Sequence, residues 1–457
     1  IFEQALKILY MEEEMEFESI EDYQNYLKQR QELLAYCKKI NQGIENLDEK
    51  SGERAIWELV QNARDMDENS RIRIELKPDK IVFSHHGKPF DYTSLLALVN
   101  QNSSKDNPGA DLVGQYGTGF MTTHAFCDIV KVSAPYKVMS GPEKLKGYVY
   151  MQNFELNRSY RNDLEKAICE MRKEMKLVDD MHKTLPLYQK YDLLGEKQKW
   201  TSFTYQLEPS VVNSVSRQLA SAIRLMPFVL VINERIKEIE VNDLCAKRHF
   251  RIIKTNSIDK QRMEGDTEWF KVVNEIETTD MLTGKSTAIS VVSLQSFNEE
   301  GKVNDVVILP PYPESCGSVD TIPGLFLWFP LLGTENFGVN FIFHSKRWHP
   351  VEKRNNIMLP ENVSSKREKG VHNEKILHEM MAALHRFYAC EGNASALSLD
   401  MCSVNFHSDK DDEITIRFYK DLQDMWKAVV PSWKVIPTDD GLKAMNDARV
   451  RVLHPDF

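Results

Sequence analysis

Three polar side chains recur along one stretch of the chain, and their types suit metal and water chemistry. Glu58, Asn62 and Asp65 stand at i, i+4 and i+7 within ERAIWELVQNARDMD, residues 53–67. At about 100° per residue, this spacing puts them on one face of an α-helix. An Asn carbonyl oxygen can bind Mg²⁺, and a carboxylate one turn earlier can orient or deprotonate a water molecule. A solvated helix face has the same pattern, so the spacing alone leaves both interpretations open.

A glycine-rich segment, GQYGTGF at residues 114–120, supplies a second chemical feature. Its glycines permit a tight bend that lets backbone N–H groups approach phosphate oxygens, and a helix starting near Phe120 would add its dipole. The preceding residues 100–111 have loop composition throughout, which suits a mobile lid. Taken with the polar helix face, the segment predicts a nucleotide site.

The elements that must position these residues follow from the spacing of apolar side chains. Ile56, Leu59, Val60 and Ala63 form the buried side of the polar helix. Residues 1–45 predict a helical lead-in, and residues 155–199 predict a charged helical insertion. The other predicted elements of the first half are strands at 70–75, 80–86, 128–134, 148–154 and 200–207, helices at 91–99, 121–126 and 211–225, and a final hairpin of 228–232 with 236–241.

A second group of strands begins near residue 247. A basic, irregular stretch follows at 343–370, then an amphipathic helix over 376–387 that starts near Asn373. Residues 393–457 carry no clear pattern. The predicted strands are 250–254, 269–273, 288–294, 306–309, 325–330 and 339–343.

The bulk composition excludes several classes of protein. With 457 residues, of which 42% are hydrophobic and 28% charged, the chain suits a soluble globular protein of about two to four domains. Its 58 basic and 68 acidic residues give a net charge of −10, which disfavours an extended nucleic-acid surface. The 7 cysteines never form a CxxC pair, so neither a disulfide framework nor a zinc site is expected. We see no apolar run near the roughly 18 residues that span a bilayer and no signal peptide, and we expect a cytoplasmic protein.

Four segments together resemble the ATP-binding fold shared by gyrase, the heat-shock-ninety chaperones, histidine kinases and MutL, the GHKL superfamily. ELVQNARD is similar to the first motif, and GQYGTGF nearly matches the lid motif of the heat-shock-ninety branch. WTSFTYQL resembles a later strand, and FSHHGKPF resembles the sacsin-type branch. The resemblance covers roughly residues 50–135 and 200–241.

This resemblance implies an α+β fold class. A Bergerat-type α/β sandwich, with helices over one face of a mixed sheet, would bind ATP and be followed by a second α/β domain like the middle domain of chaperones and MutL-type proteins. The implied limits are a lead-in over 1–45, an ATP-binding domain over 46–245 that contains the 155–199 insertion, a middle-like domain over 246–392, and a C-terminal segment of unknown role over 393–457.

The resemblance also implies roles for individual residues. Glu58 would activate water, Asn62 would hold Mg²⁺ and Asp65 would line the base or ribose side. Thr201 would sit by the adenine through water, and Lys105 would approach the phosphates, although a strand residue and a solvated loop lysine are the plain alternatives. The triphosphate would be wrapped by Gly114, Gln115, Tyr116, Gly117, Thr118, Gly119 and Phe120.

One position departs from the family pattern. The second motif normally begins with an Asp that accepts a hydrogen bond from the adenine amine, and here His85 stands before His86 and Gly87. A neutral imidazole nitrogen can accept that bond when its tautomer is right. The preference for adenine therefore stays open, as does the alternative of a histidine that merely ends a strand.

In the family a basic side chain of the second domain reaches back to the γ-phosphate. Arg354 is the first candidate for this role, ahead of Lys346 and Arg347, and a solvated basic loop is the alternative. The implied function is an ATPase switch, in which Mg²⁺-dependent binding and slow hydrolysis of ATP drive lid closure and domain docking.

Several functions and partners are compatible with such a switch. It could serve chaperone-like remodelling or a stress or antiviral defence protein, acting on a protein client, and dimerisation is common in the family. The alternatives are a scaffold that binds ATP with little turnover and a MutL-like or topoisomerase-like DNA-processing subunit, which the acidic charge disfavours. A histidine kinase is excluded because residues 1–83 contain no histidine.

Overall fold

The chain forms two compact units, which are described one at a time. Unit 1 is built from residues 1–51, 89–110 and 114–206, and unit 2 from residues 52–88, 111–113 and 207–457. The domain limits given above stay a prediction. The computed structural model describes residues 19–48, 50–101, 119–139, 144–184, 189–263, 268–316, 321–335, 337–351, 354–360, 364–390, 402 and 413–451.

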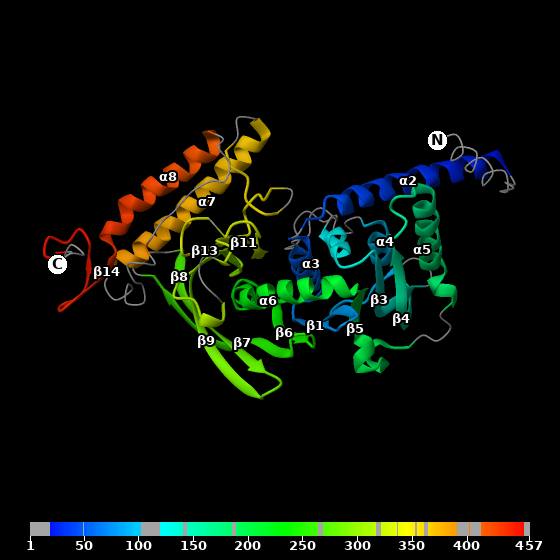
Figure 1. The fold of residues 1–457 in the computed structure, drawn as a ribbon, viewed down its shortest axis with the longest axis horizontal. Coiled ribbons are helices and arrows are strands. Elements are labelled where there is room, and N and C mark those ends of the chain that lie inside the picture. Colours follow the sequence, from blue (N-terminus) through cyan, green and yellow to red (C-terminus); the bar gives the residue numbers. More distant parts are fainter. Residues whose placement is uncertain are drawn as a thin grey trace. The chain divides into compact units, whose positions relative to one another are not determined.

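Unit 1 combines an antiparallel sheet of order β5-β3-β4 with helices (Figure 1). Along β3, buried Val130 and Val132 alternate with exposed Lys131, the period of two expected for a half-buried strand. Helix α4 begins at a capping box formed by Asp91 and Ser94. The bounds are β3 (Ile129–Met139), β4 (Leu145–Asn157), β5 (Trp200–Gln206), α2 (Ile20–Glu45), α4 (Tyr92–Asn100), α5 (Leu164–Thr184) and the 3₁₀ helices η1 (Gly119–Ala125), η2 (Tyr191–Leu193) and η3 (Glu196–Lys199).

Unit 2 contains a mixed sheet of order β12-β11-β13-β10-β9-β8-β7-β6-β1-β2. The pairs β1–β6 and β11–β13 are parallel, and the others that we describe here are antiparallel. The chain is thus of mixed α+β class. The bounds are β1 (Ser70–Leu76), β2 (Lys80–His86), β6 (Ile236–Asp243), β7 (Arg248–Arg262), β8 (Trp269–Asp280), β9 (Lys285–Phe297), β10 (Val303–Ile308), β11 (Leu325–Leu327), β12 (Phe329–Pro330) and β13 (Ile342–Ser345).

Helix α3 of unit 2 carries Glu58, Asn62 and Asp65, and helix α6 contacts it. Helix α3 (Ser51–Met66) buries Ile56, Leu59, Val60 and Ala63, so the predicted apolar side is confirmed. Helix α6 (Pro209–Ile232) packs across the sheet from β6 to β10. The two helices touch where Ser221 Oγ donates a 2.8 Å hydrogen bond to Glu53 Oε1. This hydrogen bond ties α3 to α6 within unit 2.

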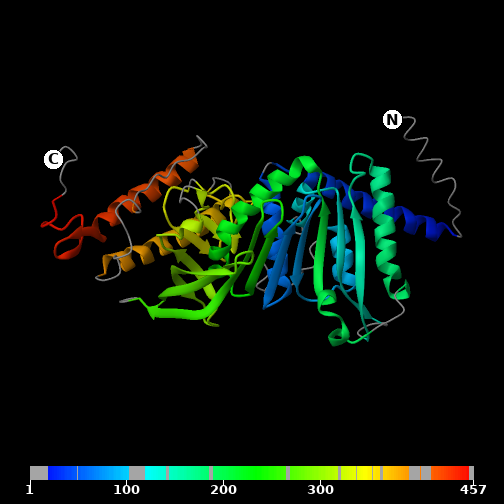
Figure 2. The same cartoon turned by 60° about the horizontal axis from the view of Figure 1, so that its bottom comes forward.

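The C-terminal part of unit 2 forms its own hydrophobic cluster. Helices α7 (Ser364–Ala389) and α8 (Glu413–Val429) lie side by side in both views (Figures 1 and 2). Trp426 and Trp433 pack on Phe341 with ring centroids 5.5 and 6.3 Å apart. The remaining elements are η4 (Glu314–Cys316), η7 (Val430–Ser432), β14 (Lys434–Thr438) and β15 (Gly441–Ala444).

Helix α6 corrects two sequence predictions. Residues 228–232 were expected as a strand of a hairpin, but they continue α6, which runs through Pro227. The helix is also long and apolar enough to cross a membrane by composition, contrary to the expectation that no such run exists. Most of that apolar stretch is buried in the structure, and all residues from Leu225 to Ile232 are buried, so core packing accounts for its apolar character.

Two further expectations need correction. The helix expected at 121–126 is the 3₁₀ helix η1, which begins at Gly119, and within the charged insertion the α-helix extends only over Leu164–Thr184. Conversely, the hairpin of 70–75 with 80–86 is confirmed, with Ile72 opposite His85. Five of the six second-half strands are confirmed with longer or shifted bounds, but the single strand expected at 325–330 is two short antiparallel strands, β11 and β12, because the chain turns at Trp328.

Candidate functional site

The three predicted polar residues of α3 differ in their exposure. The Glu58 side chain is 15% exposed, Asn62 is half-buried and Asp65 is buried. Within the described residues, the structure gives no hydrogen bond for the Asn62 side chain. One helix face of unit 2 therefore carries two carboxylates and a carboxamide whose oxygen is available to a cation.

Arg354 meets this face from a point almost three hundred positions further along the chain. Its Nη1 lies 3.8 Å from Glu58 Oε1 and donates a 2.9 Å hydrogen bond to Gln61 Oε1, across a separation of 293 positions. The Arg354 backbone has φ +50°, a left-handed conformation that costs about 1–2 kcal/mol for a residue with a Cβ. Such strain persists only where surrounding contacts enforce it. The arginine is thus held against the candidate catalytic carboxylate.

Lys346 and Arg347 were the alternatives to Arg354. Arg347 donates to Asp305 and Glu379 at 2.8 and 2.9 Å, so its guanidinium ties β10 to α7. The Lys346 backbone N–H donates to Asn304. Of the three, Arg354 is the one for which the structure gives a contact with Glu58.

His85 and Gly87 were expected on the side of the pocket that binds the nucleotide base. His85 is 4% exposed, and burial lowers its pKa to about 4, so the imidazole is neutral at pH 7. Gly87 lies close to the end of α3: an added Cβ would stand 3.0 Å from His85 Nδ1 and 3.1 Å from Met66 Cβ. A larger residue at 87 would therefore push the strand end away from α3.

The remaining predicted residues belong to unit 1 or are not described. Gly119 and Phe120 begin η1, where the Phe120 ring lies 5.6 Å from that of Phe203. Thr201, on β5, is fully buried, and its Oγ1 has no hydrogen-bond partner in the described part of the chain. Buried hydroxyls are normally paired, so a ligand or water is the expected partner. Lys105, Gly114, Gln115, Tyr116, Gly117 and Thr118 lie outside the described residues.

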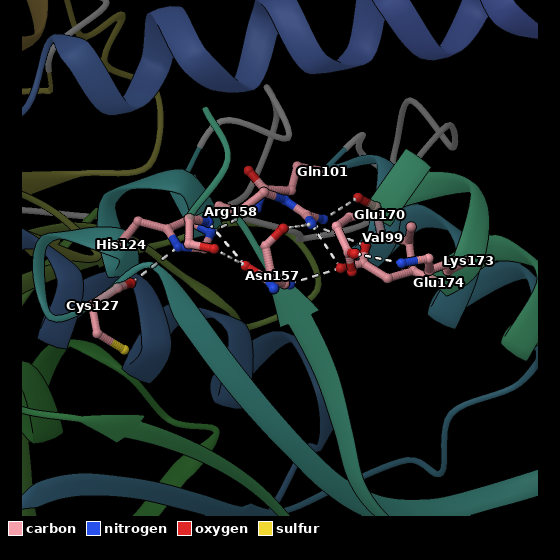
Figure 3. Close-up of polar contacts among 10 residues, drawn as sticks. Val99, Gln101, His124, Cys127, Asn157, Arg158, Glu170, Lys173 and Glu174 are labelled. Atoms are coloured by element: carbon pink, nitrogen blue, oxygen red, sulfur yellow. Dashed lines mark hydrogen bonds and ion pairs between the residues drawn. The ribbon is translucent and has the colours of Figure 1, made fainter. Parts of the chain in front are cut away.

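Unit 1 also contains a buried polar network that the sequence did not indicate (Figure 3). Arg158 Nη1 donates to both carboxylate oxygens of Glu174 at 2.9 Å, and its Nη2 donates to the Val99 carbonyl at 2.9 Å. Beside it, Gln101 and His124 join through their Nε2 atoms at 2.9 Å. The network fixes the C-terminal end of α4 relative to α5 and η1.

His124 should make unit 1 sensitive to acid. Its Nδ1 lies 3.2 Å from the Cys127 carbonyl and donates to it, which leaves Nε2 as acceptor for Gln101. Burial, reinforced by Arg158, lowers the pKa of His124 to about 3. The unfolded chain binds this proton near pH 6.5 and the folded chain does not, so stability falls as pH drops from about 6.5 towards 3.

His124→Gln should therefore reduce the acid-induced loss of stability by up to about 1.4 kcal/mol per pH unit in that window. Urea unfolding of wild type and variant at pH 7, 6, 5 and 4.5 measures this. An identical pH dependence in both proteins would contradict the burial of a neutral His124.

No protein-family model matches the chain, and no curated protein is significantly similar to it. Among the described residues, no group of three or more His, Cys, Asp or Glu side chains could hold a metal ion. A metal ion at α3 would therefore be held by the Asn62 side-chain oxygen together with oxygen atoms of a bound ligand, as Mg²⁺ is held in a nucleotide complex.

Glu58, Asn62 and Asp65 on α3 were identified from the sequence, but a neighbouring row of side chains on the same helix was missed. Trp57, Gln61 and Arg64 stand at i, i+4 and i+7, one position before Glu58, Asn62 and Asp65. Each contacts the second half of unit 2: the Trp57 ring lies 6.2 Å from Phe329, Gln61 pairs with Arg354, and the Arg64 guanidinium lies 4.2 Å from the Trp328 ring centroid. Their i, i+4, i+7 spacing in the sequence could have revealed this second row of side chains.

Proposed function

We propose that this protein is a Mg²⁺-dependent ATPase of the GHKL type, with a Bergerat-like nucleotide site on α3 and a switch that works through Arg354. The observation that carries the proposal is the approach of Arg354 to Glu58, 3.8 Å between Nη1 and Oε1. The resemblance implies a basic residue of the second domain that reaches back to the γ-phosphate, and an arginine beside Glu58 would be near a phosphate bound at this helix. The left-handed backbone of Arg354 also supports the proposal, because such a conformation persists only where surrounding contacts enforce it.

Glu58 would act as the general base. A carboxylate within reach of the attacking water can orient it and accept its proton, which contributes about 10²- to 10⁴-fold to the rate. In the structure Arg354 lies against this carboxylate and Gln61. An anionic γ-phosphate would compete for the guanidinium, so nucleotide binding would move positive charge from Glu58 to the phosphate and leave Glu58 able to accept a proton.

The residues present fit the expected ligand. Mg²⁺ takes few protein ligands and completes its shell with phosphates and water, and the Asn62 side chain would hold it. Bound there, the ion would neutralise charge on the phosphates. His85, neutral because burial lowers its pKa to about 4, can accept a hydrogen bond from a base amine.

Asn62→Ala tests this proposal directly. Wild type should bind ATP with Mg²⁺, and the variant should lose at least about tenfold of the Mg²⁺-dependent affinity, because one ligand of the ion is gone. Titration calorimetry with and without Mg²⁺ measures this, and GTP as a competitor reports the base preference of His85. Asn69→Ala, in the exposed turn after α3, is the matched control. Equal Mg²⁺-dependent affinities for Asn62→Ala and wild type would contradict the assignment.

A scaffold that binds ATP but turns it over little is the second candidate. The Arg354–Glu58 approach favours it if the arginine stays at Glu58 after nucleotide binds, because the base would then remain engaged. Steady-state turnover of wild type separates the two candidates. A protein client and a dimer partner stay predictions from the resemblance, as does cytoplasmic location.

A further inference from the structure

Arg64 is a buried cation on α3 that the proposed mechanism does not use. The residue is 3% exposed. Its Nη1 donates a 3.0 Å hydrogen bond to Asp65 Oδ1, and its Nε donates to Asn233 Oδ1 at 3.1 Å. The guanidinium lies 4.2 Å from the Trp328 ring centroid. These described contacts of the cation all come from groups of unit 2.

Trp328 is itself fixed in place at the turn between β11 and β12. Its backbone has φ +65°, a left-handed conformation that is rare for a bulky residue. Its carbonyl accepts a 2.7 Å hydrogen bond from Asn233 Nδ2, and its N–H donates to His344 Nδ1 at 3.1 Å. The Trp328 and His344 rings are 4.9 Å apart. A strained backbone with this many supports is typical of a position where placement of the side chain matters.

Asn233 links the two sides of this arrangement. It is fully buried at the C-terminal end of α6, where its N–H and Nδ2 both bond the Val229 carbonyl. Its Oδ1 accepts from Arg64 while its Nδ2 also donates to Trp328. The orientation of the guanidinium is thus defined by two elements, α6 and the β11–β12 turn, that lie far from α3 in sequence.

A buried charge is costly, and apolar residues of similar volume often replace buried ion pairs without loss of stability. Packing alone therefore does not explain an arginine here. One of its described partners is Asp65, the carboxylate next to it, whose side chain has no exposed surface and which follows Glu58 and Asn62 on the same helix face.

We propose that Arg64 is a positioning residue: clamped by Trp328 and Asn233, it sets the orientation of the Asp65 carboxylate that recognises the base or ribose of the nucleotide. The inference rests on the proposed function. It adds that nucleotide affinity depends on the contact of Arg64 with the β11–β12 turn. The carboxylate would accept hydrogen bonds from the ligand's amine or hydroxyl groups, so its orientation governs binding and leaves the chemical step to Glu58.

A double-mutant cycle of Arg64→Lys and Asp65→Asn tests this inference. A lysine keeps the positive charge, but its ammonium cannot stack on Trp328 and donate to Asn233 and Asp65 together. Each single variant should raise the Kd and KM for ATP about tenfold with kcat within about twofold, the pattern of lost ground-state binding. The double variant should be no weaker than the weaker single, because both changes remove one effect. Calorimetry gives Kd, and steady-state assays give kcat and KM.

Controls separate this role from simple stability. Arg73→Lys changes an exposed arginine whose Nε bonds Glu240 at 3.0 Å, and it should leave Kd unchanged. Trp328→Phe keeps an aromatic face and should raise Kd less than Arg64→Lys does. Hydrogen exchange of the α3 amides without nucleotide should remain protected in Arg64→Lys.

Three results would overturn the inference: an unchanged Kd in Arg64→Lys, effects of the two substitutions that multiply, or an Arg64→Lys variant whose kcat falls with its affinity. Wild-type protein that binds no ATP would instead refute the proposed function. The wild-type titration therefore distinguishes failure of one from failure of the other.

Discussion

Glu58→Gln is expected to bind ATP with a Kd within about threefold of wild type and to lose about 10²- to 10⁴-fold in turnover. Glutamine keeps the volume of the side chain and leaves the hydrogen bond from Arg354 to Gln61 in place. It cannot take a proton from water at neutral pH. Removing the base should therefore affect kcat and leave binding intact, which single-turnover hydrolysis and equilibrium titration measure separately.

The same helix offers a matched control for this substitution. Glu53 lies on α3, but its carboxylate accepts the 2.8 Å hydrogen bond from Ser221 on α6. Glu53→Gln should therefore retain wild-type turnover. If Glu58→Gln hydrolyses ATP at the wild-type rate, the general base lies elsewhere and Glu58 is only the partner of Arg354. If both variants lose turnover with falling thermal stability, the effect is structural.

Sequence periodicity captured the parts of this fold that depend on local patterns. The stripe of Ile56, Leu59, Val60 and Ala63 specifies the buried side of α3, and alternation specifies the hairpin of β1 and β2. The helix expected at 91–99 is present as α4, and Asp91 before an apolar run gives it a local reason to start there.

The end of α6 shows where local patterns fail. FVLVI at residues 228–232 is a short apolar run after a proline, and such a run fits a buried strand or a buried helix equally well by periodicity. Pro227 also argued for a break, since proline removes one helical hydrogen bond. Tertiary packing decided the outcome, because these residues are buried on all sides against the sheet of unit 2 and gain most from remaining helical.

The candidate site was predictable only in part, for a related reason. Glu58, Asn62 and Asp65 could be grouped from spacing, since a helix relates them. Arg354 was one of several cations in a basic stretch, and the resemblance ranked it first; nothing in its neighbours indicated a contact with Gln61. Contacts such as that of Arg64 with Trp328 join residues separated by most of the chain, and a single sequence contains no signal for them.

Glu174→Ala is expected to destabilise unit 1 by about 3–5 kcal/mol, the largest stability effect that we predict. The substitution leaves Arg158, 5% exposed in its side chain, buried without its carboxylate, and it removes the acceptor of the Asn157 N–H. Burial already raises the pKa of Glu174 although Arg158 opposes the shift, so the pair balances a large desolvation cost with its contacts. The double variant Arg158→Met with Glu174→Leu removes both charges and should recover much of the loss.

Hydrogen exchange of amides in β4 and α5 measures this stability within unit 1, so that the response of unit 2 does not obscure it. Lys173→Ala is the matched control on α5: Lys173 bonds Glu170 at 2.7 Å, but its side chain is 70% exposed, and its removal should leave protection unchanged. A Glu174→Ala variant as protected as Lys173→Ala would mean that water reaches Arg158 and that the pair contributes no more than a surface ion pair. A double variant as unstable as Glu174→Ala would instead assign the loss to the carbonyl of Val99, the end of α4 that Arg158 also holds.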